Sequence, residues 1–281
     1  MKTSKQLIAF LTGCMVAVGI NLSHACTVII GWDGDRVLVG NNEDWLKYDA
    51  KYWYEEPGKD DRYGALLFGF RGNGTFGQGG MNTEGLFFDG TYIDKIPLDP
   101  QMREGRKAAK TQIFKHMLKR CASVEEALQY LDQFFIPFIR SAQVVIADKT
   151  GDYAVVHANG VVRRREPEER FAVITNFHLS HLETGNYTCA RYDQAHERLE
   201  SADQITEQLF REILDATHQD GEQVKTVYSN VYDLTNRVVH TYYLFDYTRP
   251  ITVRIADLAT PGKVSSGPVY LRDLQGVREE Y

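Results

Sequence analysis

Short apolar runs separated by turn residues fill much of the chain after residue 25, and they predict strands. Thr27–Trp32 and Arg36–Gly40 are rich in β-branched residues and flank Asp33-Gly34-Asp35, a pattern typical of a hairpin. The same pattern recurs where Gln143–Ala147 and Tyr153–His157 flank the turn 148–152. The segment after residue 25 is therefore expected to begin directly in a strand.

Other stretches follow the same criteria. Further strands are predicted at Ala65–Phe70, Gly85–Asp89, Phe171–Thr175, Thr226–Tyr232, Arg237–Leu244 and Ile251–Ile255. The aromatic and charged stretch 45–64 has no clear period and is expected to be a loop, and the Gly-rich stretch 72–80 is expected to be a turn region.

Helical spacing of apolar residues predicts helices in four places. These are Ala109–Cys121, a segment that starts at the capping box Ser123-Val124-Glu125-Glu126, 189–202 and 204–217. Strands and helices thus come in blocks, with hairpins and without regular βαβ alternation. This order predicts an α+β fold in which helices cover antiparallel sheets. Neither an internal repeat nor a linker interrupts the sequence, so one domain over 26–281 is the simplest interpretation.

The first 25 residues resemble an export signal. Lys2 and Lys5 give a basic start, Leu7–Leu22 is mostly apolar, and Ser23-His24-Ala25 puts small residues at −3 and −1 of a cut before Cys26. The sequence therefore predicts a signal peptide over 1–25 and a periplasmic or secreted protein. No later stretch approaches the ~20 apolar residues of a membrane span.

A second cleavage site stays open. Leu11-Thr12-Gly13-Cys14 looks like the cleavage box of a bacterial lipoprotein, which would give a lipidated Cys14 and an internal Cys26. The apolar run before Cys14 is shorter than usual for a signal and continues past that residue, so the cut before Cys26 is favoured.

Charge and cysteine content narrow the class further. The formal charge is −6, removal of the two signal lysines makes it more negative, and no basic run is present, which argues against a nucleic-acid partner. After the cut, Cys26, Cys121 and Cys189 would remain, so at least one thiol must be unpaired within the chain. The sequence leaves open whether Cys121 and Cys189 form a bridge or two buried thiols.

Two motif matches carry little weight. Gly72-Asn73-Gly74-Thr75-Phe76-Gly77 fits G-x-G-x-x-G, but a dinucleotide site needs that motif to open a helix, and here a strand is expected. His178 and His181 have helical spacing for a metal pair, but the sequence offers no further ligands at a recognisable spacing.

An N-terminal cysteine combines two catalytic groups. Its thiol is a nucleophile, and its α-amino group, with a pKa of ~8 in water, is a general base near neutral pH. Such a residue needs a carboxylate that holds the amine and donors for the oxyanion of an attacked amide. If Cys26 becomes the first residue, it fits this chemistry.

Candidates for these accessory groups follow in the chain. Glu43 and Asp44 end the second strand of the first hairpin and should point to opposite sides, so only one would face Cys26. Asn176 ends an apolar strand, where a side-chain amide could stabilise an oxyanion. Arg191 opens a predicted helix, and a nearby guanidinium would favour a thiolate.

Together these residues resemble the N-terminal-nucleophile hydrolases of the linear amide group, which contains choloylglycine (bile salt) hydrolases, penicillin V acylases and acyl-CoA:6-aminopenicillanic acid acyltransferases. The resemblance rests on an ordered set of motifs along nearly the whole mature chain. These are Cys26-Thr27, the hairpin end Gly40-x-Asn42-x-Asp44, Gly80-Met81-Asn82-Thr83-Glu84-Gly85-Leu86, the Ser123 helix start, an Asp-x-x-Gly hairpin, Thr175-Asn176, and Arg191.

The resemblance implies an αββα sandwich and a role for each site residue. Cys26 would be nucleophile and base, Asp44 would hold its amine, and Arg191 would lie by the thiol. The side chain of Asn176 and the backbone N–H of Tyr92 would bind the oxyanion. Penicillin V acylases similarly have tyrosine at that position. Asn82 lies in a matched motif without an assigned role.

Two departures from bile salt hydrolases are visible. Asn41 stands where those enzymes have arginine, and the segment between Asn176 and Arg191 is much shorter. Both argue against a bile salt hydrolase, and the short segment together with the small size of the chain favours the acyltransferase-like branch. The resemblance implies no cofactor and no metal, a small acyl amide as substrate, and leaves a homo-oligomer open.

The sequence therefore predicts an exported hydrolase of non-peptide linear amides that acts through a thioester on Cys26. An amine could replace water, which would make the enzyme an acyltransferase. Tyr52-Trp53-Tyr54 and the Phe134-Phe135 and Phe138 region are candidates for an acyl pocket or, alternatively, core. The alternative of another class is a lipid-anchored binding protein processed at Cys14, in which Cys26 is inert.

Overall fold

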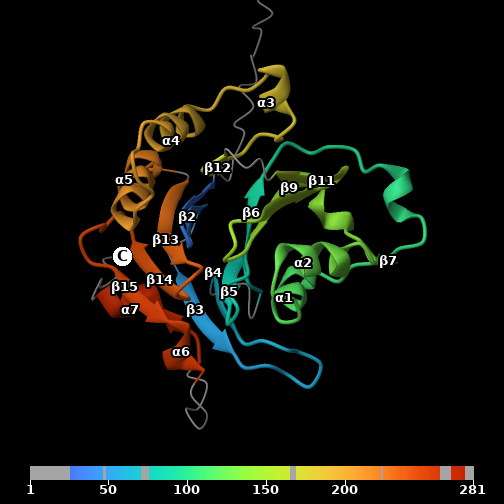
Figure 1. The fold of residues 1–281 in the computed structure, drawn as a ribbon, viewed down its shortest axis with the longest axis horizontal. Coiled ribbons are helices and arrows are strands. Elements are labelled where there is room, and N and C mark those ends of the chain that lie inside the picture. The colour runs from blue at the N-terminus through green and yellow to red at the C-terminus, as the bar shows by residue number, and fades with distance from the viewer. Residues whose placement is uncertain are drawn as a thin grey trace, which may run out of the picture.

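Two antiparallel sheets lie face to face between helices, in a computed structural model that describes residues 26–46, 49–70, 76–164, 169–222, 224–259 and 267–275. Figure 1 shows helices α4 and α5 over one sheet and α1 and α2 over the other. This arrangement is the αββα sandwich, so the predicted fold class is confirmed. The predicted signal peptide, 1–25, and Cys14 lie outside the described residues.

The first sheet carries the start of the described chain at its centre. Within the described residues it has six strands in the order β12 (Phe171–Ile174), β1 (Thr27–Asp33), β2 (Arg36–Trp45), β13 (Lys225–Asp233), β14 (Val238–Tyr243) and β15 (Ile251–Arg254). The predicted β1–β2 hairpin forms, and Gly34 adopts a φ of 58° in its turn, a conformation that favours glycine.

The second sheet is larger. Its eight described strands follow the order β11 (Gly160–Arg164), β10 (Tyr153–His157), β9 (Ala142–Ala147), β6 (Phe87–Tyr92), β5 (Gly79–Asn82), β4 (Ala65–Phe70), β3 (Ala50–Glu55) and β16 (Val269–Tyr270). A short parallel pair is formed by β7 (Lys107–Ala108) and β8 (Phe134–Phe135).

The helices are mostly short. They are α1 (Ile113–Leu118), α2 (Val124–Leu131), α3 (His181–Thr184), α4 (Ala190–Glu200), α5 (Glu207–Thr217), α6 (Ile255–Leu258) and α7 (Leu271–Gln275), with 3-10 turns at Pro100–Arg103 and Pro137–Ser141. Ser123 caps α2, because its side chain accepts a hydrogen bond from the backbone N–H of Glu126 at 3.2 Å. None of the helices in the described ranges is long and apolar enough to cross a membrane.

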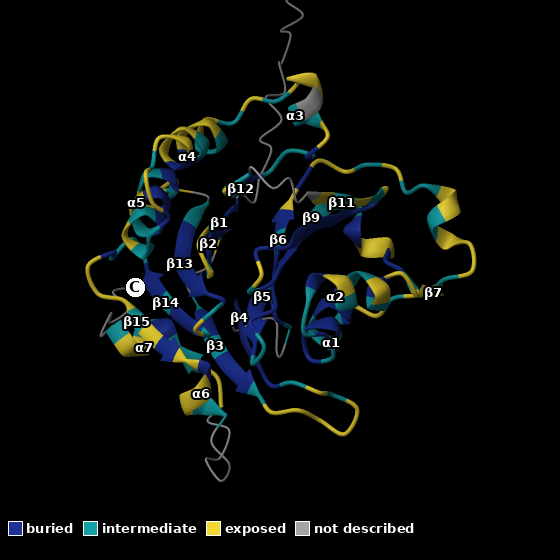
Figure 2. Ribbon diagram, viewed as in Figure 1, coloured by how far each residue is buried: buried dark blue, intermediate teal, exposed yellow. Residues whose placement is uncertain are grey.

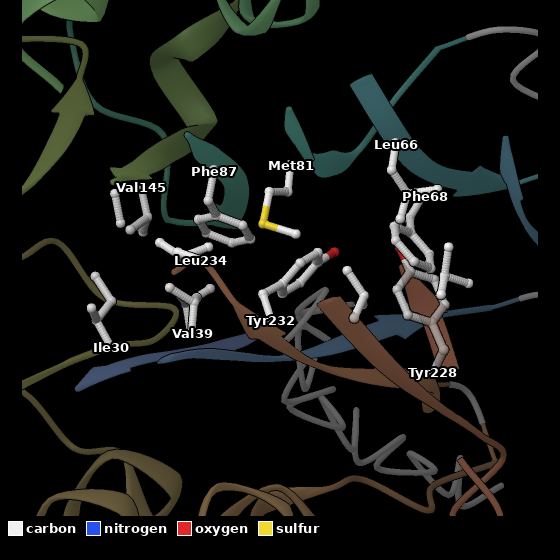
Figure 3. Close-up of a cluster of buried hydrophobic side chains, with 14 of the residues drawn as sticks. Ile30, Val39, Leu66, Phe68, Met81, Phe87, Val145, Tyr228, Tyr232 and Leu234 are labelled. Carbon is white, nitrogen blue, oxygen red and sulfur yellow. The ribbon is translucent and has the colours of Figure 1, made fainter. Parts of the chain in front are cut away.

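Aromatic side chains fill the space between the two sheets. In Figure 3, Phe87 and Met81 from the second sheet point toward Tyr232 from the first. The rings of Phe87 and Tyr232 meet edge-on with centroids 4.9 Å apart. This edge-on contact stabilises the core beyond the burial of apolar area alone. The core thus holds the two sheets together.

Each sheet also buries its outer face under helices. Met117 and Leu118 of α1 pack with Phe88 and Ile146 of the second sheet, and Phe210 of α5 packs with the first sheet. Figure 2 shows the central strands of both sheets mostly dark blue and the solvent side of α4 yellow. The helices are thus amphipathic covers, as their sequence period predicts.

Several sequence predictions need correction. The stretch 45–64, predicted to be a loop, contains strand β3, which pairs with β4 and β16. The predicted helix from Ala109 begins only at Ile113. The turn region 72–80 ends in strand β5 from Gly79, and positions 71–75 lie outside the described residues. Strands β7, β8, β11 and β16 and helices α3, α6 and α7 were not predicted, and the boundaries of the other elements differ from the predictions by a few residues.

The cysteine question is settled. Cys26, Cys121 and Cys189 are free thiols, so Cys121 and Cys189 are not bridged. Cys121 is buried under the second sheet in the core formed with α1 and α2, whereas Cys189 is half-buried beside Thr175.

Candidate active site

The β1–β2 hairpin brings the predicted nucleophile and its acidic neighbours together. Thr27 pairs with Asn42, so Cys26, one residue before Thr27, lies beside Glu43, one residue after Asn42. Side chains alternate along β2, so the side chains of Glu43 and Asp44 point to opposite faces of the strand. Glu43 lies by Cys26, and Asp44 lies on the other face.

The side chain of Glu43 is the carboxylate that reaches the thiol. The Cys26 Sγ lies 3.8 Å from Glu43 Oε2 and donates to it. Asp44 contacts the thiol through its backbone N–H, while its carboxylate accepts hydrogen bonds from Thr226 Oγ1 and, at 2.5 Å, from Gln219 Nε2. Of the two acidic residues, Glu43 is therefore the one whose side chain faces the Cys26 thiol, as expected for one of them. The role of Asp44 in holding the α-amino group of Cys26 stays a prediction.

Three buried carboxyls surround this thiol. Burial, with the charges of Asp89 and Asp44, raises the pKa of Glu43 well above its ordinary value. Burial raises the pKa of Asp44 and of Asp89 from 3.8 to about 7. Burial and these carboxylates in turn raise the pKa of the Cys26 thiol. An isolated thiol at this position is therefore held protonated at neutral pH.

A second group of predicted residues forms a hydrogen-bonded chain next to Cys26. Arg191, in the first turn of α4, donates through Nη1 to the carbonyl of Cys26 at 3.0 Å and to Thr27 Oγ1 at 2.9 Å. Its Nη2 donates to Asn176 Oδ1 at 2.8 Å, and Asn176 Nδ2 donates to the carbonyl of Tyr92 at 2.8 Å. The structure therefore brings together four of the five predicted site residues in one network, with Asp44 on the adjacent strand.

A buried frame that sequence reasoning missed holds Asn176 in place. The carbonyl of Thr175 accepts hydrogen bonds from Gln143 Nε2 at 2.9 Å and from Thr91 Oγ1 at 3.1 Å. Gln143 Nε2 also donates to the carbonyl of Phe177 at 2.9 Å. The two residues that flank Asn176 are thus fixed from the second sheet. Polar residues at inward positions of predicted strands, such as Gln143, were the available signal.

The thiol opens into a cavity of ≈ 280 Å³. Its walls include Cys26, Glu43, Asp44 and, from β6, Gly90 and Tyr92. The predicted nucleophile, its acidic neighbours and the predicted oxyanion position at Tyr92 therefore border one space that a small molecule can enter.

The predicted acyl-pocket residues separate into different places. Phe138 lines a pocket next to the thiol cavity, whereas Phe134 and Phe135 line a different one near α2. Tyr52, Trp53 and Tyr54 form part of β3 and pack in the cores, and none of them lines the thiol cavity.

Asn82, which the sequence left without a role, is a structural anchor. Its Nδ2 donates to the carbonyls of Leu118 and Cys121, both at 2.7 Å, and its Oδ1 accepts from the backbone N–H groups of Glu84 and Leu86, both at 2.9 Å. The motif around Asn82 thus fastens the β5–β6 turn to the end of α1.

The two histidines considered for a metal do not line the thiol cavity. His178 is 3.3 Å from His157 through Nε2 and Nδ1, and its ring also lies near that of His181. Over the part of the chain that the structure describes, no group of three or more His, Cys, Asp or Glu side chains is arranged to hold a metal ion.

Comparison with solved structures supports the fold. Penicillin V acylase from Agrobacterium tumefaciens aligns with a TM-score of 0.64 and 15% identity, over 86% of this chain and 89% of that one. A variant of conjugated bile acid hydrolase from Clostridium perfringens gives 0.63 and 15%, over 83% and 93%. The Caenorhabditis elegans ortholog of N-acylethanolamine-hydrolyzing acid amidase gives 0.53 and 17%, over 75% and 93%.

Comparison of the sequence identifies the family. A search of curated proteins finds no significant match. Residues 32–247 match the family described as acyl-coenzyme A:6-aminopenicillanic acid acyl-transferase, which covers most of the chain. The resemblance inferred from the motifs is thereby confirmed. The chain belongs to the acyl-coenzyme A:6-aminopenicillanic acid acyl-transferase family and has the αββα fold of the N-terminal-nucleophile hydrolases.

Proposed function

We propose that this protein hydrolyses a non-peptide linear amide through a thioester on Cys26. The observation that carries the proposal is the position of the Cys26 thiol. The thiol lines a cavity of ≈ 280 Å³. Arg191 connects the same residue to the predicted oxyanion donor, because it donates to the backbone carbonyl of Cys26 and to the side-chain oxygen of Asn176. A nucleophile, a candidate oxyanion donor and room for a substrate therefore coincide.

Activation is proposed to occur by removal of residues 1–25 during export. The cut would give Cys26 a free α-amino group beside Glu43 and Asp44. The buried carboxyls support this step, because a cluster with raised pKa values is stabilised by a cation. An α-ammonium at Cys26 would supply that cation and would draw the carboxyls into their ionised forms. Export would then also be activation.

The proposed reaction has two halves. The amino group takes the thiol proton, and the thiolate attacks the carbonyl carbon of the amide. Asn176 Nδ2 and the backbone N–H of Tyr92 stabilise the oxyanion. The C–N bond breaks as the leaving amine takes a proton from the Cys26 ammonium. Water then attacks the thioester, gives a proton to the amino group and releases the carboxylic acid and the thiol.

The relatives support a small acyl amide as substrate. The names of the three solved structures describe hydrolysis of penicillin V, conjugated bile acids and N-acylethanolamines, in each case an amide of an acyl group. The departures at Asn41 and between Asn176 and Arg191 argue against a bile salt for this chain. Transfer of the acyl group to an amine instead of water is the second candidate, because the matching family is one of acyl-transferases.

Substitution of Cys26 tests the proposal. With p-nitroanilides of short carboxylic acids, the protein processed before residue 26 should release p-nitroaniline and show one added acyl mass by intact mass spectrometry. Cys26→Ala should show neither product nor adduct. Cys26→Ser should retain only a small fraction of the rate, since its hydroxyl is a weaker nucleophile. Unchanged turnover in Cys26→Ala would refute the assignment of the nucleophile.

A further inference from the structure

We propose that Glu43 is a further catalytic residue, which stays protonated beside Asp89 and donates a hydrogen bond to the sulfur of Cys26 when the thiolate forms. The motif Gly40-x-Asn42-x-Asp44 leaves position 43 open, so the resemblance gives this glutamate no role. The inference rests on the proposed function, because it concerns the thiolate of the same reaction.

Glu43 belongs to a buried pair of carboxyls between the two sheets. Asn41 and Glu43 are two residues apart on β2, so their side chains lie on one face of the strand, and Asn41 contacts Asp89 of β6 from that face. Glu43 and Asp89 are both almost completely buried, and the charge of Asp89 acts on Glu43. Two buried carboxyls that interact in this way resist double ionisation, because their like charges repel. The pair therefore holds a proton.

Hydrogen bonds favour Glu43 as the carboxyl that holds this proton. Asp89 accepts from the backbone N–H of Gly90 at 2.7 Å and from Asn41 Nδ2 at 2.6 Å, and both donors favour its ionised form. Within the described residues, Glu43 accepts a hydrogen bond only from the Cys26 thiol, at 3.8 Å, and a thiol is a weak donor. Glu43 is thus the less stabilised carboxylate of the two and keeps the proton.

An unsatisfied acceptor beside the pair indicates the same missing donor. Asn41 Oδ1 is buried and has no hydrogen-bond partner in the part of the chain that the structure describes. Turning the amide over would not help, because it would replace the Nδ2 donor to Asp89 by a second oxygen. A proton on Glu43 adds a donor to this cluster of acceptors. A cation at position 41 would neutralise the pair, whereas the asparagine present there leaves its charge in place.

The α-ammonium of the processed chain is better matched to Asp44 than to Glu43. It shifts the cluster toward ionisation, but it carries a single charge against three buried carboxyls. The carboxylate of Asp44 accepts from Thr226 and Gln219, and the charge of Arg191 also favours its ionised form. Asp44 therefore pairs with the ammonium most readily, and the proton on Glu43 remains.

The other titratable groups that face Glu43 do not offer the sulfur a cation. Burial, with the charges of Glu43 and Asp89, raises the pKa of Tyr228 and Tyr232 of β13 well above the usual range, so both phenols stay neutral. Burial also raises the pKa of the Cys26 thiol. A thiolate at Cys26 therefore needs hydrogen-bond donors at its sulfur.

Protonated Glu43 supplies one of these donors. The backbone N–H of Asp44 already donates to the sulfur. When the thiol proton has moved to the amino group of Cys26, the contact of 3.8 Å reverses, and the O–H of Glu43 donates to the thiolate. An ionised Glu43 would repel the thiolate instead. Activity should therefore fall as pH rises through the pKa of Glu43.

Two substitutions distinguish a donor from a carboxylate at position 43. Glu43→Ala removes the donor, and loss of a hydrogen bond to a charged group should lower kcat for an acyl p-nitroanilide by about 10–100-fold. Glu43→Gln keeps an N–H donor that cannot ionise, so it should recover most of that loss and extend activity to higher pH. Glu200→Gln, at an exposed glutamate, is the matched control.

Asp89→Asn tests the sharing of the proton. It keeps the size of the side chain but removes the charge that holds the proton on Glu43, so the alkaline fall of kcat should begin at a lower pH. In the Glu43→Gln background the same change should leave the pH profile in place, because glutamine does not titrate. Asp94→Asn, at an exposed aspartate, is the matched control.

Infrared spectroscopy of the processed protein near neutral pH detects the proton without turnover. The difference between wild type and Glu43→Gln should contain the C=O band of an un-ionised carboxyl, which shifts in D₂O. A difference with carboxylate bands alone, or a Glu43→Gln kcat as low as that of Glu43→Ala, would overturn the role of Glu43 while thioester formation on Cys26 still stood. Failure of the processed wild type to form a thioester with any acyl p-nitroanilide would overturn the proposed function, and the catalytic role of Glu43 with it.

Discussion

Arg191 binds the side-chain oxygen of Asn176, with Arg191 Nη2 2.8 Å from Asn176 Oδ1. An asparagine amide has one acceptor and one donor end, and a guanidinium can only donate, so this contact fixes which end faces the helix. Nδ2 is consequently turned toward Tyr92 O, 2.8 Å away, at the edge of the thiol cavity. The arginine thus orients the amide that the proposed mechanism uses.

Replacement of Asn176 should affect the chemical step. Asn176→Ala removes one of the two proposed oxyanion donors, and loss of one such donor typically lowers kcat by about 10²–10³-fold. KM should change little, because the contact strengthens in the transition state. Steady-state kinetics on an acyl p-nitroanilide measures both. Asn186→Ala, at an exposed asparagine, is the control. An Asn176→Ala kcat within threefold of wild type would contradict the assignment.

Arg191 should act partly through Asn176. Arg191→Ala is expected to lower kcat by about tenfold or more, because the amide loses its fixed orientation and the Cys26 carbonyl loses a donor. In the Asn176→Ala background the same change should cost less, since residues in one network are not additive. Arg198→Ala, on the exposed side of the same helix, controls for changes in α4. Fully additive losses would mean that Arg191 works independently of Asn176.

The buried carboxyls predict how stability depends on pH. In a chain that retains residues before Cys26, the pKa of Asp44 and of Asp89 is raised from 3.8 to about 7 by burial. The folded state then binds more protons than the unfolded state between these values. The free energy of unfolding should therefore fall as pH rises from about 4 to 7, by on the order of 2–4 kcal/mol per independent group.

Urea unfolding at a series of pH values measures this decline. Asp44→Asn should flatten it relative to the parent chain, whereas Asp94→Asn, at an exposed aspartate, should not. Comparison of variants also removes the opposite contribution of His157, whose pKa is lowered to about 4 by burial and by His178. A chain processed before Cys26 should show a shallower decline, because its ammonium favours ionised carboxyls. The same slope in all four proteins would count against a buried acidic cluster.

Asn82 should matter for stability. Asn82→Ala removes four hydrogen bonds of a fully buried side chain and leaves two carbonyls and two N–H groups without that partner. Each buried polar group left unsatisfied costs about 1–3 kcal/mol, so a loss of at least ~3 kcal/mol is expected. Denaturant unfolding measures it, with Asn159→Ala at an exposed site as the control. A loss below 1 kcal/mol would refute the anchor role.

Local sequence signals predicted those parts of the fold that local chemistry determines. The Asp-Gly turn gave the first hairpin, and the Ser123 capping box gave the start of α2. Strand β3 was missed because its aromatic and charged residues have no clear alternation, and because one of its two partners, β16, lies near the other end of the chain.

The site shows the same division. Alternation along β2 predicted that Glu43 and Asp44 face opposite sides, but the choice of Glu43 for the thiol follows from the β1–β2 register, in which Thr27 pairs with Asn42. Thr91 and Gln143 support Asn176 through the neighbouring carbonyl of Thr175. Both residues lie far from Asn176 in sequence and were not predicted. Their contact arises only when the two sheets stack.

The central claim is that Cys26 is the first residue of the active protein and carries the acyl group. The most direct measurement is the intact mass of the protein from the exported fraction, before and after brief incubation with an acyl p-nitroanilide. The account predicts an unlipidated chain that begins at Cys26 and gains one acyl mass, located at that residue by peptide mapping. A chain that begins at a lipidated Cys14, or that retains residues before Cys26 and still turns over the amide, would contradict it.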